Sequence, residues 1–400
     1  MEDFQAYLEN IKKSFNKAFK DEERAQHLEL NSVDRELPPT GIILDNPLLE
    51  YAFDRRFMAY GRCYLIYGKK GCSKTTLLFE MAKIFQKAGG KMFWIETENA
   101  PDFNYMKLQG VNPENVIYHN PRSLEEALTL IKTIIESIPK HDPDSKTPIM
   151  IALDSVAGAA SEYERDQDII GQTKVGEHAK LMSTFYRNVV PYLESEKAVL
   201  VVTNQLKEQI GGMTYGPEKP EALIGGEAQR FNSTYQFKVA KITDILENDH
   251  MGVKRKCGSS HILTTKRNKL GREGNSQKIG FDVYINGGID WYTPLVKLLG
   301  EEYTSLVGKT GGWYTWKTPG VQTSLVTDSG EVVLGEIPTD KKFRDRELAM
   351  LIKESSQAKE MCRKAFGIPD MPDEDVTKTI ETKNKARRKK KSKLEEDLEN

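Results

Sequence analysis

Residues 68–76 read GKKGCSKTT and lie between an apolar run, Cys63–Tyr67, and a helix-like pattern over Thr75–Lys87. A strand, a glycine-containing turn and a helix in this order are typical of a phosphate loop. Glycine lets backbone N–H groups close around phosphate oxygens, and the start of the helix adds partial positive charge. The stretch departs from GxxxxGK[ST] at Ser73, which stands where the pattern has glycine. A chance turn is therefore the alternative interpretation.

The phosphate loop predicts a nucleoside triphosphate with Mg²⁺ as the ligand. Lys74 is expected to reach the β- and γ-phosphates, and the Thr75 hydroxyl is expected to bind Mg²⁺. The residues expected to contact the nucleotide in this stretch are Gly68, Lys69, Lys70, Gly71, Cys72, Ser73, Lys74, Thr75 and Thr76.

Two acidic strand ends extend the predicted site. The run PIMIALD ends in Asp154, which is placed to hold the Mg²⁺ shell together with Thr75. Capping of the following helix is the alternative role for this aspartate. The run MFWIETE ends in Glu98, whose carboxylate can polarise the attacking water. Glu96 is the second candidate for that base, and solvated acids at a strand end are the alternative.

Alternating strands and helices decide the fold class. The runs Met92–Glu96, Pro148–Asp154 and Ala198–Thr203 are strand candidates, and the last two are apolar enough to be buried on both faces of a sheet. Helical patterns cover Leu124–Ile138 and Gly176–Leu193. This order predicts an α/β fold with a mostly parallel central sheet. Three later runs alternate apolar and polar residues as antiparallel strands do, over Tyr235–Ile242, His261–Thr265 and Lys278–Ile285.

The chain is predicted to have four parts. Residues 1–36 are predicted to form an N-terminal helical segment, because they carry an apolar stripe with helical spacing. The stripe consists of Phe4, Tyr7, Leu8, Ile11, Phe15 and Phe19. Residues 37–292 are expected to form the core. Residues 293–371 are expected to form a small α+β domain with a helix near 343–366. Residues 372–400 are highly charged and are expected to be disordered.

The composition bounds the classes of function. The 400 residues carry a net charge of −1, so a nucleic-acid site must be a local basic patch. The cysteines lack zinc spacing and are expected to be reduced thiols in a cytosol; they are Cys63, Cys72, Cys257 and Cys362. The polar N-terminus is no signal peptide, and no apolar run approaches the roughly 20 residues of a membrane span. A soluble, intracellular protein without a membrane partner is expected.

The order of motifs resembles that of the RecA family, bacterial RecA and its phage relatives of the UvsX type, from about residue 40 to residue 366. The matching segments are TGIILD at 40–45, GKKGCSKTT at 68–76, ETENAPDFNY at 96–105, ALDSVAG at 152–158, VVTNQ at 201–205, IGGM at 210–213, GGEAQRF at 225–231, FDVYINGGID at 281–290 and GGWYTW at 311–316. The resemblance implies a RecA-type core and an ATPase that polymerises on single-stranded DNA and pairs it with homologous duplex DNA.

The resemblance also implies roles for single residues. Glu98 looks like the water-activating base, Tyr105 stacks on adenine and Asp102 meets the adenine amino group. Gln205 resembles the glutamine that senses the γ-phosphate and signals into the following loop, with a strand cap as the alternative. A basic pair, Arg267 and Lys269, resembles the residues that reach the ATP of the neighbouring subunit, as arginine fingers do. A solvated basic turn is the alternative for that pair.

Two loops are expected to carry the DNA site, residues 158–174 and 206–224. The second is long for a structureless segment inside a compact domain, which favours a functional role. By resemblance, phosphate contacts come from Lys180, Arg187, Lys207 and Arg230, and bases are wedged apart by Ile210 and Met213. Phosphate contacts give affinity without sequence choice. Thr214 stands where the family has a bulky residue, so the identity of the residue that separates the bases is left open.

The expected assembly is a helical filament, a homo-oligomer whose head-to-tail contacts do not close. A single-strand-binding protein and a loading mediator are expected further partners. The N-terminal stripe docks either on the adjacent subunit or on its own core. The basic run KNKARRKKKSK at 383–393 is either an arm for duplex DNA or a solvated tail.

Two other functions compete with the recombinase. One is a RecA-like motor such as a hexameric helicase or a branch-migration protein, and the other is a nucleotide-dependent regulatory protein that does not touch DNA. The regulatory protein is expected to turn over ATP at a rate that single-stranded DNA does not change, whereas the turnover of a recombinase depends on single-stranded DNA. The chain is expected in the bacterial cytoplasm, and Ser73 and the basic tail favour a phage protein in its host.

Overall fold

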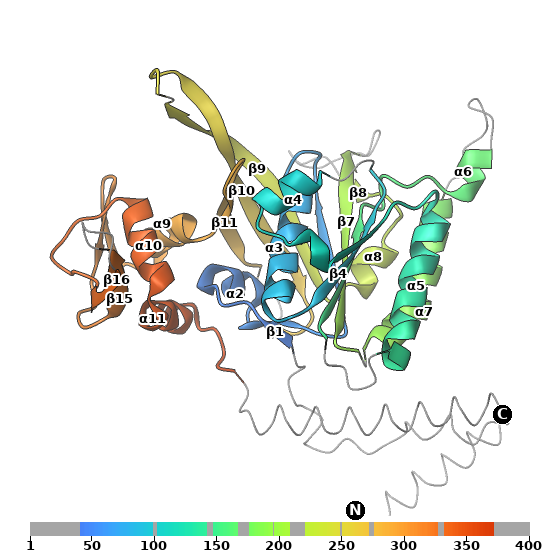
Figure 1. Ribbon diagram of the computed structural model, residues 1–400, viewed down its shortest axis with the longest axis horizontal. Helices are drawn as coiled ribbons and strands as arrows, with labels where there is room; N and C mark the ends of the chain where they lie inside the picture. The colour runs from blue at the N-terminus through green and yellow to red at the C-terminus, as the bar shows by residue number, and fades with distance from the viewer. Residues whose placement is uncertain are drawn as a thin grey trace, which may run out of the picture. The chain divides into compact units, whose positions relative to one another are not determined.

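In the computed structural model, the described residues are 41–98, 102–141, 147–166, 176–194, 196–208, 221–248, 250–271, 276–326 and 332–371, and they belong to one compact unit. Figure 1 shows this unit in colour. The predicted N-terminal segment (1–36) and the charged tail (372–400) lie outside the described residues.

A ten-stranded sheet forms the centre of the unit. Its order is β12-β11-β10-β9-β3-β7-β6-β4-β5, and β8 pairs with β7. The six strands from β9 to β5 in this order are parallel, whereas β9, β10, β11 and β12 pair antiparallel. The predicted α/β fold with a mostly parallel sheet is confirmed. The strands are β3 (Arg62–Gly68), β4 (Lys91–Glu96), β5 (Val116–His119), β6 (Ile149–Asp154), β7 (Ala198–Glu208), β8 (Glu221–Leu223), β9 (Tyr235–Asn248), β10 (Lys254–Asn268), β11 (Lys278–Tyr284) and β12 (Gly288–Asp290).

Both faces of the parallel strands are buried. In β3, Tyr64 and Ile66 belong to the core that includes α3 (Lys74–Lys87), while Leu65 and Tyr67 belong to the opposite core with α5 (Leu124–His141) and α7 (Glu177–Leu193). Successive strand residues point to opposite faces, so an unbroken apolar run is what such a strand requires. Figure 1 shows α3 on one side of the sheet and α5 and α7 on the other.

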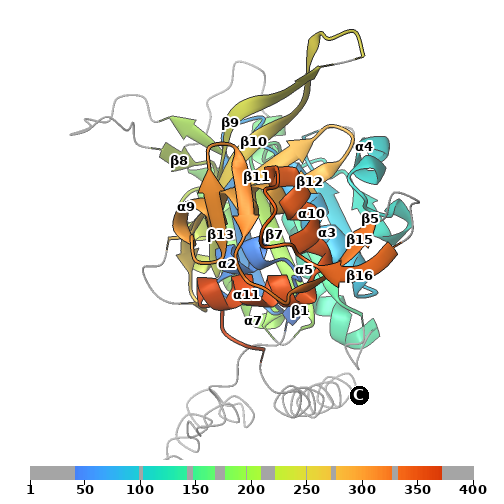
Figure 2. The same ribbon diagram turned by 90° about the vertical axis from the view of Figure 1, so that its left-hand side faces the viewer.

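The antiparallel strands β9 and β10 are longer than the sequence predicted. They pair out to Asn248 and Lys254, although the alternation of apolar residues ends near Ile242. The outer half of the hairpin is mostly exposed, so burial leaves no apolar signature there. Figure 2 shows this outer half projecting beyond the rest of the sheet.

The helix expected near residues 343–366 is two helices, α10 (Asp345–Glu354) and α11 (Ser356–Phe366). Ser355 separates them because its hydroxyl accepts a hydrogen bond from Ala358 N (3.0 Å) and caps α11. The other elements are β1 (Gly41–Ile43), α2 (Pro47–Phe53), β2 (Phe57–Ala59), α4 (Phe103–Leu108), the 3₁₀ helix η3 (Pro113–Asn115), α6 (Glu162–Asp166), α8 (Ala228–Asn232), α9 (Tyr292–Glu302), β13 (Val307–Thr310), β14 (Trp313–Trp316), β15 (Gln322–Val326) and β16 (Val332–Glu336).

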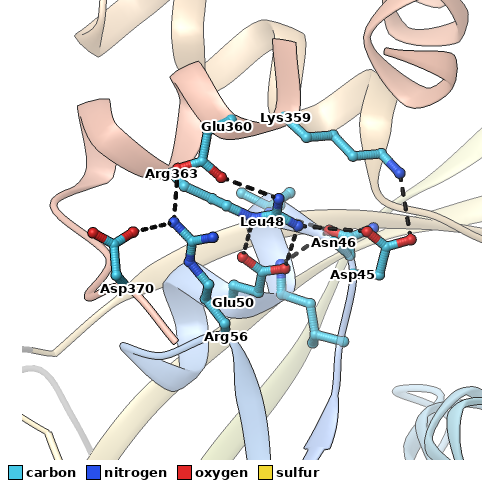
Figure 3. Close-up of polar contacts among 10 residues, drawn as sticks. Asp45, Asn46, Leu48, Glu50, Arg56, Lys359, Glu360, Arg363 and Asp370 are labelled. Carbon is cyan, nitrogen blue, oxygen red and sulfur yellow. Dashed lines mark hydrogen bonds and ion pairs between the residues drawn. The ribbon is translucent and has the colours of Figure 1, made fainter. Parts of the chain in front are cut away.

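A network of charges joins α11 to α2 (Figure 3). Arg363 Nε and Nη2 donate to the two carboxylate oxygens of Glu50 at 2.7 and 2.8 Å, and the Glu50 side chain is fully buried. Arg56 binds Glu360 and Asp370, both at 2.7 Å. A buried carboxylate is stable only when its charge is paired and its oxygens accept hydrogen bonds. The bidentate contact from Arg363 meets both requirements.

We expect Arg363→Ala to lower the free energy of unfolding by about 3 kcal/mol, because it leaves the Glu50 carboxylate buried without its partner. The matched control is Lys359→Ala. Lys359 lies 3.5 Å from half-exposed Asp45, so its removal should change stability by less than about 1 kcal/mol. Urea unfolding measures both variants. Equal losses would show that burial of Glu50 does not set the strength of the network.

Candidate functional site

The phosphate loop connects β3 to α3. Gly71 and Ser73 have positive φ angles of 73° and 65°, which turn the chain into the first residue of α3, Lys74. A side chain at Gly68 would collide with the Val239 carbonyl, so the start of the loop requires glycine. Lys74 is only 9% exposed, and its Nζ donates to the Lys69 carbonyl at 3.1 Å. The lysine therefore lies within the loop, where nucleotide phosphates bind in this kind of motif.

Asp154 lies beside the start of α3. Its Oδ2 accepts a hydrogen bond from the Thr75 hydroxyl at 2.6 Å, and its Oδ1 accepts one from the Thr203 hydroxyl. Burial raises the pKa of Asp154, although both hydroxyl contacts oppose this effect. A buried carboxylate next to a threonine hydroxyl is a donor set that suits Mg²⁺. The alternative of a helix cap is not seen, because the next described helix begins only at Glu162.

Glu98 lies at the same edge of the sheet. Its Oε1 accepts hydrogen bonds from Ser155 Oγ (2.6 Å) and from Gln205 Nε2 (2.7 Å). Gln205 is paired in register with Gly68, the first residue of the loop. The carboxyl ends of parallel strands meet at one edge, and this brings the predicted base, the predicted sensor and the loop together. The Glu98 side chain is exposed, so it can meet a water molecule.

Glu96 is the less suitable base. It is buried, and its carboxylate accepts a hydrogen bond from the Glu98 backbone N–H at 2.7 Å. Burial, followed by the nearby Asp154 carboxylate, raises the pKa of Glu96 to about 8. A carboxyl group that is protonated near neutral pH is a poor acceptor for a proton from water.

The raised pKa of Glu96 predicts a pH-dependent stability. The folded chain holds the Glu96 proton more tightly than the unfolded chain does. Protonated Glu96 therefore contributes fully to the free energy of unfolding below the ordinary pKa of 4.5, and this contribution is lost as the pH rises through about 8. The urea midpoint of the nucleotide-free protein should fall as the pH rises across this range. In Glu96→Gln, the slope of the urea midpoint against pH should be smaller. An unchanged slope in Glu96→Gln would contradict this origin.

Tyr105 lies against the helix that follows the phosphate loop. Its hydroxyl is 3.1 Å from Thr76 Oγ1, and its ring centroid is 6.2 Å from that of Phe79. Asp102 caps α4, because its carboxylate accepts a hydrogen bond from Tyr105 N at 2.9 Å. The structure thus gives Asp102 a local role in placing Tyr105, and the expected contact with adenine stays a prediction.

The basic pair, Arg267 and Lys269, lies far along the sheet from the phosphate loop. Lys269 N donates to Thr234 O (3.0 Å), and Thr234 N donates to Cys63 O (2.7 Å), so the pair is level with the start of β3. The loop follows the other end of β3 at Gly68, five residues or about 16 Å away along the strand. The pair therefore does not reach the phosphate loop of its own chain.

Carbonyls of α8 hold this basic pair in place. Arg267 Nη1 donates to Arg230 O (3.1 Å) and Lys269 Nζ donates to Phe231 O (2.6 Å). The Phe231 side chain is 69% exposed beside them. An exposed aromatic residue beside an arginine is typical of a surface that contacts another protein.

Comparisons with known proteins identify the family of the chain. A family model described as the RecA N-terminal domain matches residues 6–290. The chain belongs to the RecA family. A protein named Protein RecA from Helicobacter pylori (strain P12) is 29% identical over 317 residues, which are 79% of this chain and 83% of that protein. Another Protein RecA, from Chlorobium limicola, is 29% identical over 268 residues, 67% of this chain and 71% of the relative.

The residues for which the RecA resemblance implied DNA contacts are only partly described. Lys180 and Arg187 are exposed on α7. Arg230 is bound by Glu227 at 3.1 Å and lies over the Tyr67 ring. Ile210, Met213 and the side chain of Lys207 lie outside the described residues. The second loop is shorter than the predicted range 206–224, because residues 206–208 of β7 pair with residues 221–223 of β8.

Sequence reasoning missed two residues that connect Gln205 to the far end of this loop. Asn204 Oδ1 accepts from Gln205 N (2.7 Å), while its Nδ2 donates to Ile224 O (2.6 Å) and to Gln229 Oε1 (2.9 Å). Both Asn204 and Gln229 are fully buried. The only sequence signal was the polar triplet TNQ at the end of an apolar strand.

Among the described residues, no helix has both the length and the apolar content needed to span a bilayer.

Proposed function

We propose that the phosphate loop binds ATP and that Glu98 and Gln205 couple its hydrolysis to the second loop. As a member of the RecA family, the chain is an ATP-dependent DNA recombinase that uses Mg²⁺, binds single-stranded and duplex DNA and forms filaments. The observation that carries the proposal is the 2.7 Å contact between Gln205 and Glu98 at the edge where the loop begins.

Each residue has one task in this mechanism. Lys74 would bind the β- and γ-phosphate oxygens, and Thr75 and Asp154 would hold Mg²⁺, which would neutralise charge on those phosphates. Glu98 orients the attacking water and accepts its proton. Tyr105 covers the adenine.

Gln205 is proposed to transmit the state of the nucleotide. The N–H groups of its amide can donate either to Glu98, as seen, or to a γ-phosphate oxygen, because both partners are acceptors. Its backbone is joined through Asn204 to Ile224 at the far end of the second loop. A change in Gln205 therefore has a direct route to the segment proposed to grip DNA.

The basic pair is proposed to act on the ATP of the neighbouring protomer. Its distance from its own phosphate loop and the exposed Phe231 beside it support this role. The neighbour then supplies two positive charges to the transferring phosphoryl group, which makes hydrolysis depend on assembly.

We also propose the finer features of organisation. The core ends near residue 292, with a small domain over 293–371 and terminal segments (1–36 and 372–400) that serve assembly and DNA contact. A single-strand-binding protein and a loading mediator are proposed further partners. The protein acts in the bacterial cytoplasm, and Ser73 supports a phage origin. Neither competing function, the helicase-like motor or the DNA-independent regulator, is favoured by the comparisons.

The test is ATP turnover with and without single-stranded DNA, combined with the salt dependence of DNA binding. Turnover should rise with DNA. Lys180→Ala and Arg187→Ala should each weaken binding and reduce the slope of log K against log salt by about 0.7, as expected for one lost phosphate contact on a single strand. Lys132→Ala, which removes an exposed lysine of α5, is the control. DNA-independent turnover would contradict the function, and unchanged slopes would remove α7 from the DNA site.

A further inference from the structure

Ser73 adopts a backbone conformation that non-glycine residues rarely occupy. Its φ of 65° and ψ of 33° are left-handed, and this conformation is disfavoured for a residue with a Cβ atom. Ser73 also directly precedes Lys74, so its conformation determines where α3 begins and where Lys74 lies. Something outside the loop is needed to favour this conformation over the ordinary ones.

The Ser73 side chain meets a buried histidine from a distant strand. Ser73 Oγ lies 3.1 Å from His261 Nε2, and His261 Nδ1 lies 3.0 Å from the Ser259 carbonyl. Because a carbonyl only accepts, Nδ1 carries the hydrogen. In the neutral ring, Nε2 is then the acceptor and the Ser73 hydroxyl is the donor.

The surroundings of His261 keep the ring neutral and fixed. The side chain is 1% exposed and its ring stacks on Phe281, with centroids 5.1 Å apart. Burial lowers its pKa to about 4, so near neutral pH it has one lone pair for Ser73. The strand β10 is held by β9 and β11 on both sides, so the acceptor has a fixed position.

We propose that His261 is a positioning residue for the phosphate loop, and that its hydrogen bond from Ser73 holds the loop in the shape that binds ATP. The pair compensates for the absence of glycine before Lys74. The inference rests on the proposed binding of ATP by this loop, and it adds a residue from β10 to that site. Holding the loop in advance should act mainly on nucleotide affinity, because the contact does not touch the reacting atoms.

The experiment is a double-mutant cycle read as KM for ATP and kcat. Ser73→Ala and His261→Phe each remove one partner, and the phenylalanine keeps the stacking on Phe281. Each should raise KM about fivefold, the effect of one hydrogen bond, with a smaller change in kcat. Ser73→Gly should have a lower KM than Ser73→Ala, because glycine adopts this conformation without the hydrogen bond, and adding His261→Phe to Ser73→Gly should have no further effect on KM.

Two results would overturn the inference. One is an unchanged KM in Ser73→Ala, a variant that leaves the core of β10 intact. The other is an equal rise in KM when His261→Phe is made with Ser73 and with Gly at position 73, because this would show a general packing role. Nucleotide binding by Lys74→Ala is measured beside them. If that variant bound ATP normally, the proposed function would fail, whatever the result of the cycle.

Discussion

Lys74→Ala should reduce ATP turnover at saturating Mg²⁺-ATP and single-stranded DNA by about a thousandfold or more, since the variant loses a charge that stabilises the transferring phosphoryl group. The lysine is buried inside the loop and has a carbonyl as its contact there. The measurement is steady-state release of phosphate. Lys87→Ala is the matched control in the same helix, because Lys87 is exposed and lies 3.8 Å from Asp45. Lys74→Ala with turnover within tenfold of the unchanged protein would rule out this loop as the catalytic site.

Glu98→Gln should separate ATP binding from hydrolysis. The glutamine keeps the size of the side chain but cannot accept a proton, so kcat should fall by about a hundred- to a thousandfold. Binding of a fluorescent ATP analogue should change little, because the carboxylate is proposed to act on the attacking water and not to bind the phosphates. DNA should remain bound for longer, because the proposed coupling through Gln205 makes the second loop release DNA after hydrolysis.

Glu96→Gln is the comparison that decides between the two acids. Glu96 is buried and has a raised pKa, so its replacement should change kcat much less than that of Glu98. If Glu96→Gln lost turnover and Glu98→Gln retained it, the assignment of the base would be reversed.

The part of the site that follows from the chain order could be predicted from the sequence. The phosphate loop, Asp154 and Gln205 each follow an apolar run, and parallel strands bring such ends to one edge. The position of Ser73 was also visible as a departure from the glycine pattern. These predictions depend only on local composition and on the direction of the strands.

Contacts between distant segments could not be predicted in this way. His261 lies 188 residues after Ser73, and Arg363 lies 313 residues after Glu50. Which strand residue faces a loop depends on sheet register, and a shift by one residue would turn His261 to the other face. The cap that Asp102 forms on α4 was not predicted, because aspartate suits many roles, and its expected contact with adenine stays a prediction.

The nucleotide site is proposed to be completed by two protomers, and a mixing experiment tests this directly. Lys74→Ala and the double variant Arg267→Ala with Lys269→Ala should each be inactive alone. Mixed in equal amounts on single-stranded DNA, they should regain turnover at about a quarter of the interfaces, where an intact loop meets an intact basic pair of its neighbour. A mixture as inactive as either variant alone would contradict a shared site.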